Sequence, residues 1–551
     1  MSIYPTNPRS WAQLDALTVD ARRAYLDGRD AAAHRAASLS ASAAADNAAP
    51  CCPILGPRGV LRYLRSPDRD AELAAYFYPA HNTNGSASSS SENNAKAIVV
   101  AVHGHGAYWQ FEFLRMAGVG RAHVYEGSWV EALNRQGYSV CGVDNTGAGR
   151  SSGKFGLVER AEDLRDDVLA LVKALKGLGG GSSGGNAAGV SASAAPVGKR
   201  GAAAAAASAT LAAGCFGPAL AGIPGFSSTL PLFLLGPSLG GCVSVQAALA
   251  AEARLAAASS SSQAAALPFA GVVLLAPLLG LEGAASRGWN PLLRRAALVL
   301  DSLPWTREWP VAAQEPNVMF PEQQLDFDSD GATYHYPCRV RTAVQLLRAC
   351  AGVLPLPAAP APASGSSAAS VAAASEHDRR ERQAQRAGQP LREAAKRLRA
   401  PLLAFHSARD TLCDCSATEL FVEAAREGHA QRAASGGASA KAAAAAADGG
   451  AKLRRCDHLW HSVLREDSAG ELLREAVAWM DARLPGGGGG GKRAKHNNSG
   501  GGVAAAAVAA PGARATVTLS ATAGPKVAAP AAPAAAPKTR AKRSGGRAAA
   551  R

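Results

Sequence analysis

The sequence predicts an α/β protein built on a doubly wound, mostly parallel β-sheet. Five short apolar runs have the length of strands, and their continuous apolarity is typical of strands covered on both faces. Helical spacing of apolar residues lies between these runs, so strands and helices alternate along the chain. The five runs are 97–102, 138–143, 230–235, 271–275 and 401–405.

Three helices are predicted from the spacing of apolar residues and from residue types that are typical of helix ends. The first carries apolar residues from Leu164 to Leu175 and stops near Gly177. Two others open with capping boxes, in which a serine is followed three residues later by a glutamate. These pairs are Ser416 with Glu419 and Ser468 with Glu471.

Low-complexity segments rich in Ala, Gly and Ser divide the chain, and we expect them to be disordered. The segment 1–50 is predicted to be partly helical or disordered, with low complexity at about 35–50. An α/β domain is predicted over 51–485, and a disordered basic tail over 486–551. The insertions predicted within the domain are about 179–209, 256–266, 356–385 and 430–451.

The net charge of +15 is concentrated in the tail. Residues 486–551 hold eleven Lys and Arg and no acidic residue, so the rest of the chain has 47 basic against 43 acidic groups, a net of +4. Because the tail lacks aromatic residues for base stacking, we expect no specific nucleic-acid partner. The ten cysteines lack the spacing of a disulfide scaffold or a zinc site, which favours a reducing, cytoplasmic location.

A candidate nucleophile lies in Gly236-Pro237-Ser238-Leu239-Gly240. The pattern G-x-S-x-G places a serine on a tight turn between a strand and a helix, and the flanking glycines let these two elements approach closely. The pattern also occurs at Ser151, Ser182 and Ser183. Only Ser238 directly follows a predicted strand and precedes an Ala-rich helical stretch, so we predict Ser238 as the nucleophile.

The first apolar run leads into His103-Gly104-His105-Gly106. In a fold with a nucleophile elbow, the loop after the third strand supplies one backbone N–H of the oxyanion hole, and the residue after the nucleophile supplies the other. We therefore predict that the backbone N–H groups of His105 and Leu239 form the oxyanion hole. The alternatives are an ordinary turn or a metal pair at His103 and His105, but no third ligand follows nearby, so no metal is predicted.

Two further residues complete a candidate catalytic set. Asp410 follows the last apolar run, where an acid that orients a histidine belongs, although a loop Asp is more often a cap or turn residue. His458 and His461 both lie just before the last predicted helix. The order Ser, Asp, His along the chain is the order that α/β hydrolases use.

These motifs resemble the monoacylglycerol lipase-like α/β hydrolases, which are grouped with the serine aminopeptidase-type enzymes. The matching segments are QGYSVCGVDNTGAGRSSG, LLGPSLGG, HSARDTLCD and LWHSVL, within about 95–175, 228–350 and 393–485. The resemblance favours His461 over His458 and implies an α/β-hydrolase fold with a structural loop from Asp144 to Ser151. Pro237 departs from the family, which usually has a polar residue there.

The resemblance implies a serine hydrolase that cleaves monoacylglycerol, lysophospholipid or another acyl ester through Ser238, His461 and Asp410, without a cofactor. It also implies a helical cap at about 280–395 that shapes an acyl channel and can contact a lipid surface. For most of the cap's large apolar residues, packing into the cap's own core is the favoured interpretation. These residues are Trp289, Leu292, Leu293, Trp305, Trp309 and Phe320.

Two other functions remain open. The same residues would serve a serine aminopeptidase-type peptidase, which differs only in its substrate. A non-catalytic member of the fold, acting as a binding protein, is the second alternative, and the intact set of Ser238, Asp410 and His461 argues against it. The sequence does not predict an oligomeric state.

Overall fold

The structure is a computed structural model, and its described residues all fall within one compact unit, Met1–Val508. The predicted basic tail and the insertions at 179–209 and 356–385 lie outside these residues. The described residues are 18–40, 55, 58–66, 69–80, 95–176, 223, 225–258, 269–281, 290–312, 316–350, 389–437, 439, 448–466 and 469–485.

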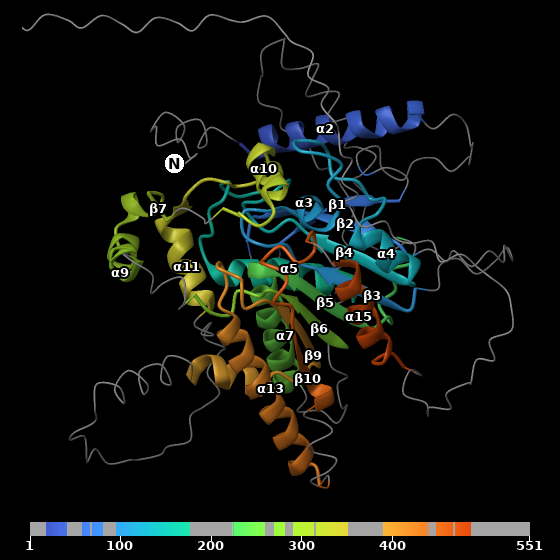
Figure 1. Ribbon diagram of the computed structural model, residues 1–551, viewed down its shortest axis with the longest axis vertical. Helices are drawn as coiled ribbons and strands as arrows, with labels where there is room; N and C mark the ends of the chain where they lie inside the picture. The colour runs from blue at the N-terminus through green and yellow to red at the C-terminus, as the bar shows by residue number, and fades with distance from the viewer. Residues whose placement is uncertain are drawn as a thin grey trace, which may run out of the picture. The chain divides into compact units, whose positions relative to one another are not determined.

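An eight-stranded sheet forms the centre of the molecule, in the order β1-β2-β4-β3-β5-β6-β9-β10 (Figure 1). β2 pairs antiparallel with β1 and β4, and the remaining neighbours are parallel. The strands are β1 Val60–Arg65, β2 Glu72–Tyr78, β3 Ala97–Ala101, β4 Tyr138–Val143, β5 Leu232–Pro237, β6 Gly271–Leu275, β9 Leu402–His406 and β10 Ala451–Arg455. The predicted doubly wound, mostly parallel sheet is confirmed.

The central strands are apolar throughout because they bury both faces. Val272 and Leu274 of β6 pack on one side with helices α5, α7 and α13, whereas Val273 and Leu275 pack on the other with α4 and α15. The same alternation holds for β3, β5 and β9. The helices that cover the sheet are α4 Trp129–Arg135, α5 Ala161–Leu175, α7 Ser238–Ala258, α13 Cys415–Ser435 and α15 Ala469–Asp481.

A cap is inserted between β6 and β9, within the predicted range of 280–395. Its two short strands pair antiparallel with each other and stand apart from the main sheet. Figure 1 shows α9 and α11 together at one side of the molecule, with α10 beside α2. The cap elements are α9 Asn290–Asp301, η1 Pro304–Thr306, β7 Pro310–Ala312, α10 Pro321–Ser329, β8 Cys338–Arg339 and α11 Val340–Cys350.

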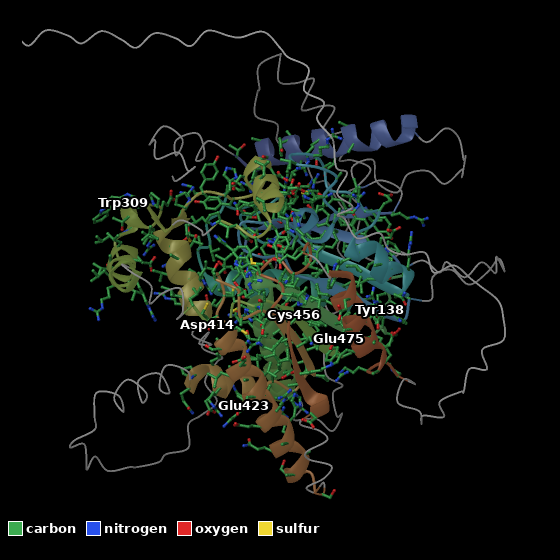
Figure 2. The ribbon with its side chains drawn as sticks, viewed as in Figure 1. Tyr138, Trp309, Asp414, Glu423, Cys456 and Glu475 are labelled. Carbon is green, nitrogen blue, oxygen red and sulfur yellow. The ribbon has the colours of Figure 1, made fainter. Side chains whose placement is uncertain are left out.

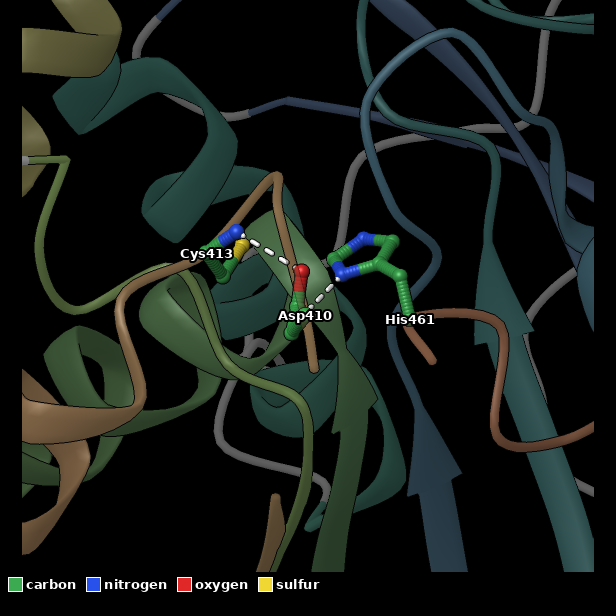
Figure 3. Close-up of side chains that lie close together, drawn as sticks. All are labelled: Asp410, Cys413 and His461. Atoms are coloured by element: carbon green, nitrogen blue, oxygen red, sulfur yellow. Dashed lines mark hydrogen bonds and ion pairs between the residues drawn. The ribbon is translucent and has the colours of Figure 1, made fainter. Parts of the chain in front are cut away.

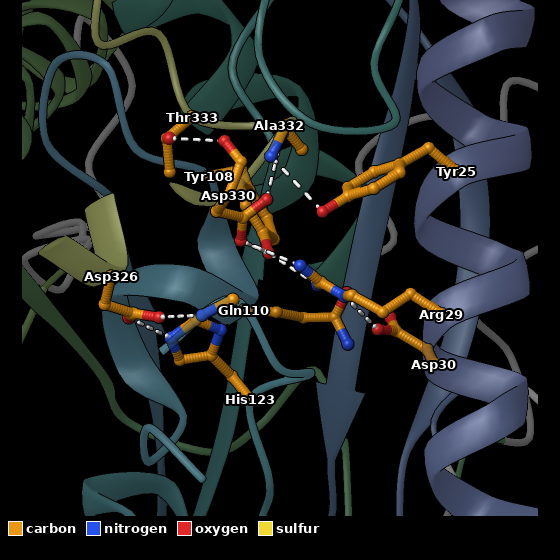
Figure 4. A network of polar contacts seen from close by, with 12 residues as sticks. Tyr25, Arg29, Asp30, Tyr108, Gln110, His123, Asp326, Asp330, Ala332 and Thr333 are labelled. Carbon is orange, nitrogen blue, oxygen red and sulfur yellow. Dashed lines mark hydrogen bonds and ion pairs between the residues drawn. The ribbon is translucent and has the colours of Figure 1, made fainter. Parts of the chain in front are cut away.

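Helix α2, Val19–Ser40, is fixed to the domain mainly by buried polar contacts. Arg150 forms ion pairs with Asp27 and Asp30 of α2. Figure 4 shows that Arg29 pairs with Asp330 and donates to the hydroxyl of Tyr108. Because these contacts are made by charged groups, the helix carries no apolar stripe that its sequence could have revealed.

Three helices extend past the approximate starts predicted for the low-complexity segments. α2 continues to Ser40 and α7 to Ala258, so both run past the predicted starts of the segments at 35–50 and 256–266. α13 likewise extends to Ser435, into the predicted insertion at 430–451. The prediction takes alanine-rich sequence as a sign of disorder. Alanine has the highest helix propensity of all residues, so an alanine-rich segment that follows a helix can continue it.

The predicted capping box of Ser416 with Glu419 is wrong. α13 begins at Cys415, and its N-cap is Asp414, whose side chain accepts a hydrogen bond from the N–H of Ser416 at 3.0 Å. Glu419 instead pairs with Arg455. The second predicted box begins at Ser468, which lies outside the described residues.

Candidate active site

Ser238 occupies a sharp turn between β5 and α7. β5 ends at Pro237, α7 begins at Ser238, and Ser238 has a positive φ of 49°, a strained conformation for a residue other than glycine. A Cβ on Gly240 would lie 1.9 Å from the carbonyl oxygen of Val102, and one on Gly236 would lie 2.3 Å from the carbonyl oxygen of Gly240. Glycine is therefore required on both sides of the turn, as the elbow pattern indicates.

The loop after β3 lies against Ser238. A Cβ on Gly104 would be 3.4 Å from the Cβ of Ser238, and His105 lines the same cavity as Ser238. Leu239 is in the first turn of α7, where backbone N–H groups have no partner within the helix. Burial, together with His103, lowers the pKa of His105 to about 4, so its imidazole is neutral near pH 7.

His461 is oriented by Asp410. The Nδ1 of His461 lies 2.8 Å from Oδ2 of Asp410, as Figure 3 shows. The same oxygen is 3.1 Å from Nε2 of His406. The other oxygen of Asp410 accepts hydrogen bonds from the N–H groups of Leu412 and Cys413. The carboxylate is therefore fixed by four donors from three parts of the chain.

The charges of this pair stabilise each other. Burial alone would raise the pKa of Asp410, but the charge of His461 and the hydrogen bonds from His406, His461 and Cys413 hold that pKa below its usual value. Burial would lower the pKa of His461, but the charge of Asp410 raises it well above its ordinary value, and the nearby Cys413 adds to that effect. The imidazole is thus a stronger base than a free histidine.

Cys413 is a neighbour of Ser238 and His461 that the sequence analysis missed. Its sulfur lies 4.0 Å from Oγ of Ser238 and also hydrogen bonds with His461, so the thiol bridges the two side chains. Among the described contacts, Ser238 is bonded to this thiol rather than to His461. If Ser238 and His461 act together, a direct bond between them would form on substrate binding, as catalytic hydrogen bonds often do.

Glu466 fixes the loop that carries His461. Its buried carboxylate accepts hydrogen bonds from the N–H groups of Trp460 and Ser462, which flank His461. Burial raises the pKa of Glu466, and these hydrogen bonds oppose that rise. The acidic residue five positions after the histidine was the signal in the sequence that could have identified it.

The other serines with the elbow pattern, and the other histidine near the last helix, do not line the cavity in the described part of the chain. Ser151 is buried, donates to the carbonyl oxygen of Asp144 and accepts from the N–H of Ala74, so it supports the loop after β4. Asp144 holds the same loop through the N–H groups of Trp109 and Arg150. His458 is exposed, away from the cavity lining. Ser182 and Ser183 lie outside the described residues.

His103 has partners at both ring nitrogens. Nδ1 lies 2.8 Å from the carbonyl oxygen of Gly104, and Nε2 accepts the N–H of Asn145 at 2.9 Å.

In the described part of the chain, one group of side chains has the spacing of metal ligands, with ligand atoms within 4.8 Å of one another: Asp410, Cys413 and His461. Two of these three are already bonded to each other as a carboxylate–imidazole pair.

A cavity of about 500 Å³ opens over Ser238 and His461. Its size suits a small-molecule ligand. Leucines from the loop after β6 and from α11 form an apolar wall, while residues of α10 and of the His461 loop supply polar side chains. The leucines are Leu278, Leu281, Leu346 and Leu347.

The parallel sheet, the strained serine elbow and the carboxylate–imidazole pair define an α/β hydrolase. Residues 93–213 match the model of the family described as serine aminopeptidase, S33, and the resemblance to that family is confirmed over this segment. No curated protein matches the sequence.

Three solved structures are similar to this chain. A monoacylglycerol lipase of Paleococcus ferrophilus is 14% identical, covering 75% of this chain and 99% of its own, with a TM-score of 0.41. An esterase of Pyrococcus furiosus is 12% identical over 78% of this chain and 91% of its own, with a TM-score of 0.37. The α/β hydrolase GrgF from a Penicillium species is 11% identical, covering 77% of this chain and 99% of its own, with a TM-score of 0.41.

Proposed function

We propose that the protein is a serine hydrolase that cleaves carboxylic esters through an acyl-enzyme. The observation that supports this most strongly is one cavity lined by both Ser238, on its strained turn, and His461, which is bonded to a buried Asp410. A positive φ at a serine is costly, and such strain is found where the surrounding structure has a functional use for it.

In the proposed reaction, Oγ of Ser238 attacks the ester carbonyl carbon while His461 takes the hydroxyl proton. The N–H groups of Leu239 and His105 stabilise the negative oxygen of the tetrahedral intermediate. His461 then protonates the leaving alcohol as the carbon–oxygen bond breaks. Water repeats the sequence, releasing the acid and restoring Ser238, while Asp410 keeps Nδ1 of His461 protonated.

Single-chain acyl esters are the proposed substrates, either monoacylglycerol or lysophospholipid. The leucine wall of the cavity provides an apolar surface for one acyl chain, and the polar side chains near His461 can contact an alcohol. Other acyl esters of similar size would use the same chemistry.

We also propose peripheral contact with lipid surfaces through the cap. Trp305 and Trp309 are 69% and 52% exposed, so the interpretation that they pack into a cap core is wrong for these two residues, whereas Phe320 is half-buried. Leu298 and Val299 of the same cap are 49% and 65% exposed. Figure 2 shows Trp309 at the outer edge of the cap. Leu292 is likewise exposed, and Trp289 lies outside the described residues. Exposed apolar residues gathered in this way mark interaction surfaces.

None of the described helices is long and apolar enough to cross a membrane. Six described cysteines, among them Cys141, Cys242 and Cys413, form no disulfide, which supports the proposal of a reducing compartment such as the cytoplasm.

A peptidase is the second candidate, because Glu112 lines the cavity. Its carboxylate accepts a hydrogen bond from the N–H of Gly104, close to Ser238, and could pair with the ammonium group of an aminoacyl substrate. Parallel assays of acylglycerols and aminoacyl amides separate the two candidates. Hydrolysis of the amides alone would favour the peptidase.

Labelling with a fluorophosphonate tests the nucleophile. The native chain should be labelled, Ser238→Ala should not, and Ser462→Ala should retain labelling because Ser462 is a second serine of the same cavity lining. An unlabelled native chain, or equal labelling of Ser238→Ala, would contradict the proposal and favour a non-catalytic binding protein.

A further inference from the structure

One end of the cavity holds buried polar atoms without partners. Nδ2 of Asn317, Oε1 of Gln323, and both Nε and Nη2 of Arg465 form no hydrogen bond, and all three residues line the cavity that contains Ser238. Asn317 is only 5% exposed. Buried polar groups are normally paired, so a cluster of unpaired ones from three segments indicates a missing polar partner.

The remaining polar atoms of these side chains are held in place. Oδ1 of Asn317 accepts the N–H of Phe320 at 2.9 Å, and Nε2 of Gln323 donates to the carbonyl oxygen of Arg465 at 2.8 Å. Each amide therefore has one anchored end and one unused end. The second bond also connects α10 of the cap to the loop that carries His461.

Arg465 is held so that one edge of its guanidinium remains unused. Its plane lies over the ring of Phe111, 3.9 Å from the ring centroid, and Nη1 lies 3.3 Å from Asp326. Asp326 also bonds with His123, as Figure 4 shows, and with the N–H of Gly120. Nε and Nη2 are adjacent donors on the same edge, and such a pair fits the two oxygens of a carboxylate or phosphate.

The position of Arg465 relative to His461 assigns this end of the cavity to the leaving group. Arg465 follows His461 by four residues in the same loop, and His461 must deliver its proton to the leaving alcohol. The leucine wall lies on other elements, α11 and the loop after β6. The charged side chains of the lining, besides His461, are Arg294, Arg465 and Glu112, so basic groups outnumber acidic ones.

We propose that Asn317, Gln323 and Arg465 form a leaving-group subsite in which the Nε–Nη2 edge of Arg465 binds an anionic group on the alcohol of a single-chain acyl ester. A phosphate, as in a lysophospholipid, and a carboxylate share this chemistry. The inference rests on the proposed ester hydrolysis and specifies its substrate class: esters with an anionic alcohol are preferred over neutral monoacylglycerol.

The kinetic test compares three esters with the same acyl chain: an acylglycerol phosphate, a neutral monoacylglycerol and the acyl ester of a hydroxy acid. The native enzyme should have the highest kcat/KM for the anionic esters, and the better of the two identifies the preferred anion. Arg465→Gln should lower kcat/KM for the anionic esters by about 10- to 100-fold, the range for losing hydrogen bonds to a charged group. The neutral ester should change by less than about threefold.

Two further variants serve as controls. Arg294→Gln removes the other cavity arginine and should leave the preference for anionic esters intact. Arg465→Lys keeps the charge but loses the paired donors, so it should restore the preference only in part. Equal losses on all three esters with Arg465→Gln, or loss of the preference with Arg294→Gln alone, would overturn the subsite.

A binding measurement separates this inference from the proposed function. Ether-linked alkylglycerol phosphate and neutral alkylglycerol cannot be cleaved, so calorimetry with the Ser238→Ala chain measures recognition without catalysis. The phosphate should bind more tightly, and adding Arg465→Gln should abolish the difference. Equal binding of the two ethers would overturn the subsite even in an active esterase, whereas an unlabelled, inactive native chain with selective binding would overturn the esterase alone.

Discussion

The sheet and the cap bury their apolar residues very differently. Residues of β3, β5, β6 and β9 are almost completely buried on both faces of the sheet, whereas the cap leaves two tryptophans more than half exposed. The candidate catalytic side chains all follow strands or precede a helix of the sheet, and the cap adds only lining to the cavity. We infer that the sheet determines the chemistry and the cap determines what approaches it.

The largest effect should come from the proposed base on the sheet side. Replacing His461 with Ala should lower kcat for a soluble ester by at least about 10⁴-fold, because the serine then has no group to accept its proton. The matched control is His458→Ala, three residues away and exposed, which should retain activity. Equal activity of both variants would remove the catalytic role from this loop.

A second test addresses the close packing of the elbow. Gly240→Ala places a Cβ against the backbone of Val102, so the free energy of unfolding should fall by about 3 kcal/mol or more. Gly449 has open space around its Cβ position, and Gly449→Ala should change stability by less than about 1 kcal/mol. Urea denaturation measures both, and a Gly240→Ala chain of native stability would contradict the packing of the elbow.

The pH dependence should reveal the coupled pair. Neutral His461 is the proposed base, so kcat/KM should fall as the pH drops through the pKa of His461. Because Asp410 raises that pKa, the acidic limb should lie above pH 6.5, the ordinary value for histidine.

In Asp410→Asn the residual activity should show this limb at lower pH, since the charge that favours the imidazolium is gone. A limb in the native enzyme at or below pH 6.5 would show that Asp410 does not raise the pKa of His461.

The smallest effect should come from the cap. A double variant in which serine replaces both Trp305 and Trp309 should bind phospholipid vesicles about tenfold more weakly. This loss is near the lower end of the free energy gained by burying one large apolar side chain. Hydrolysis of a soluble short-chain ester should remain within about twofold, because both tryptophans lie outside the cavity lining. An equal loss on soluble esters would show that the cap does more than select the surface.

The same contrast explains what the sequence could predict. Continuous apolar runs identified β3, β4, β6 and β9 within one residue, because burial on both faces leaves a strong local signal. β10 has one fully buried residue, one half-buried residue and three exposed ones, and it gave no such run. α2 was not delimited because buried ion pairs from Arg150 and Arg29 hold it, and these partners lie far away in the sequence.

The candidate site shows the same limit. Ser238, Asp410 and His461 each lie at the end of an element with its own pattern, so a motif could locate them, and the structure brings Asp410 and His461 together. Cys413 and Arg465, by contrast, gain their importance from distances to other segments. No local pattern records that the sulfur of Cys413 lies beside Ser238 or that Gln323 bonds to the Arg465 backbone.

The most direct test of the central claim is to trap the acyl-enzyme and locate the acyl group. After rapid quenching of a reaction with an activated ester, peptide mass spectrometry should find the acyl mass on the peptide that contains Ser238. Because the thiol of Cys413 lies 4.0 Å from Ser238, it is the nearest competing nucleophile. An acyl group on Cys413, or no acyl group at Ser238 during turnover, would contradict the account.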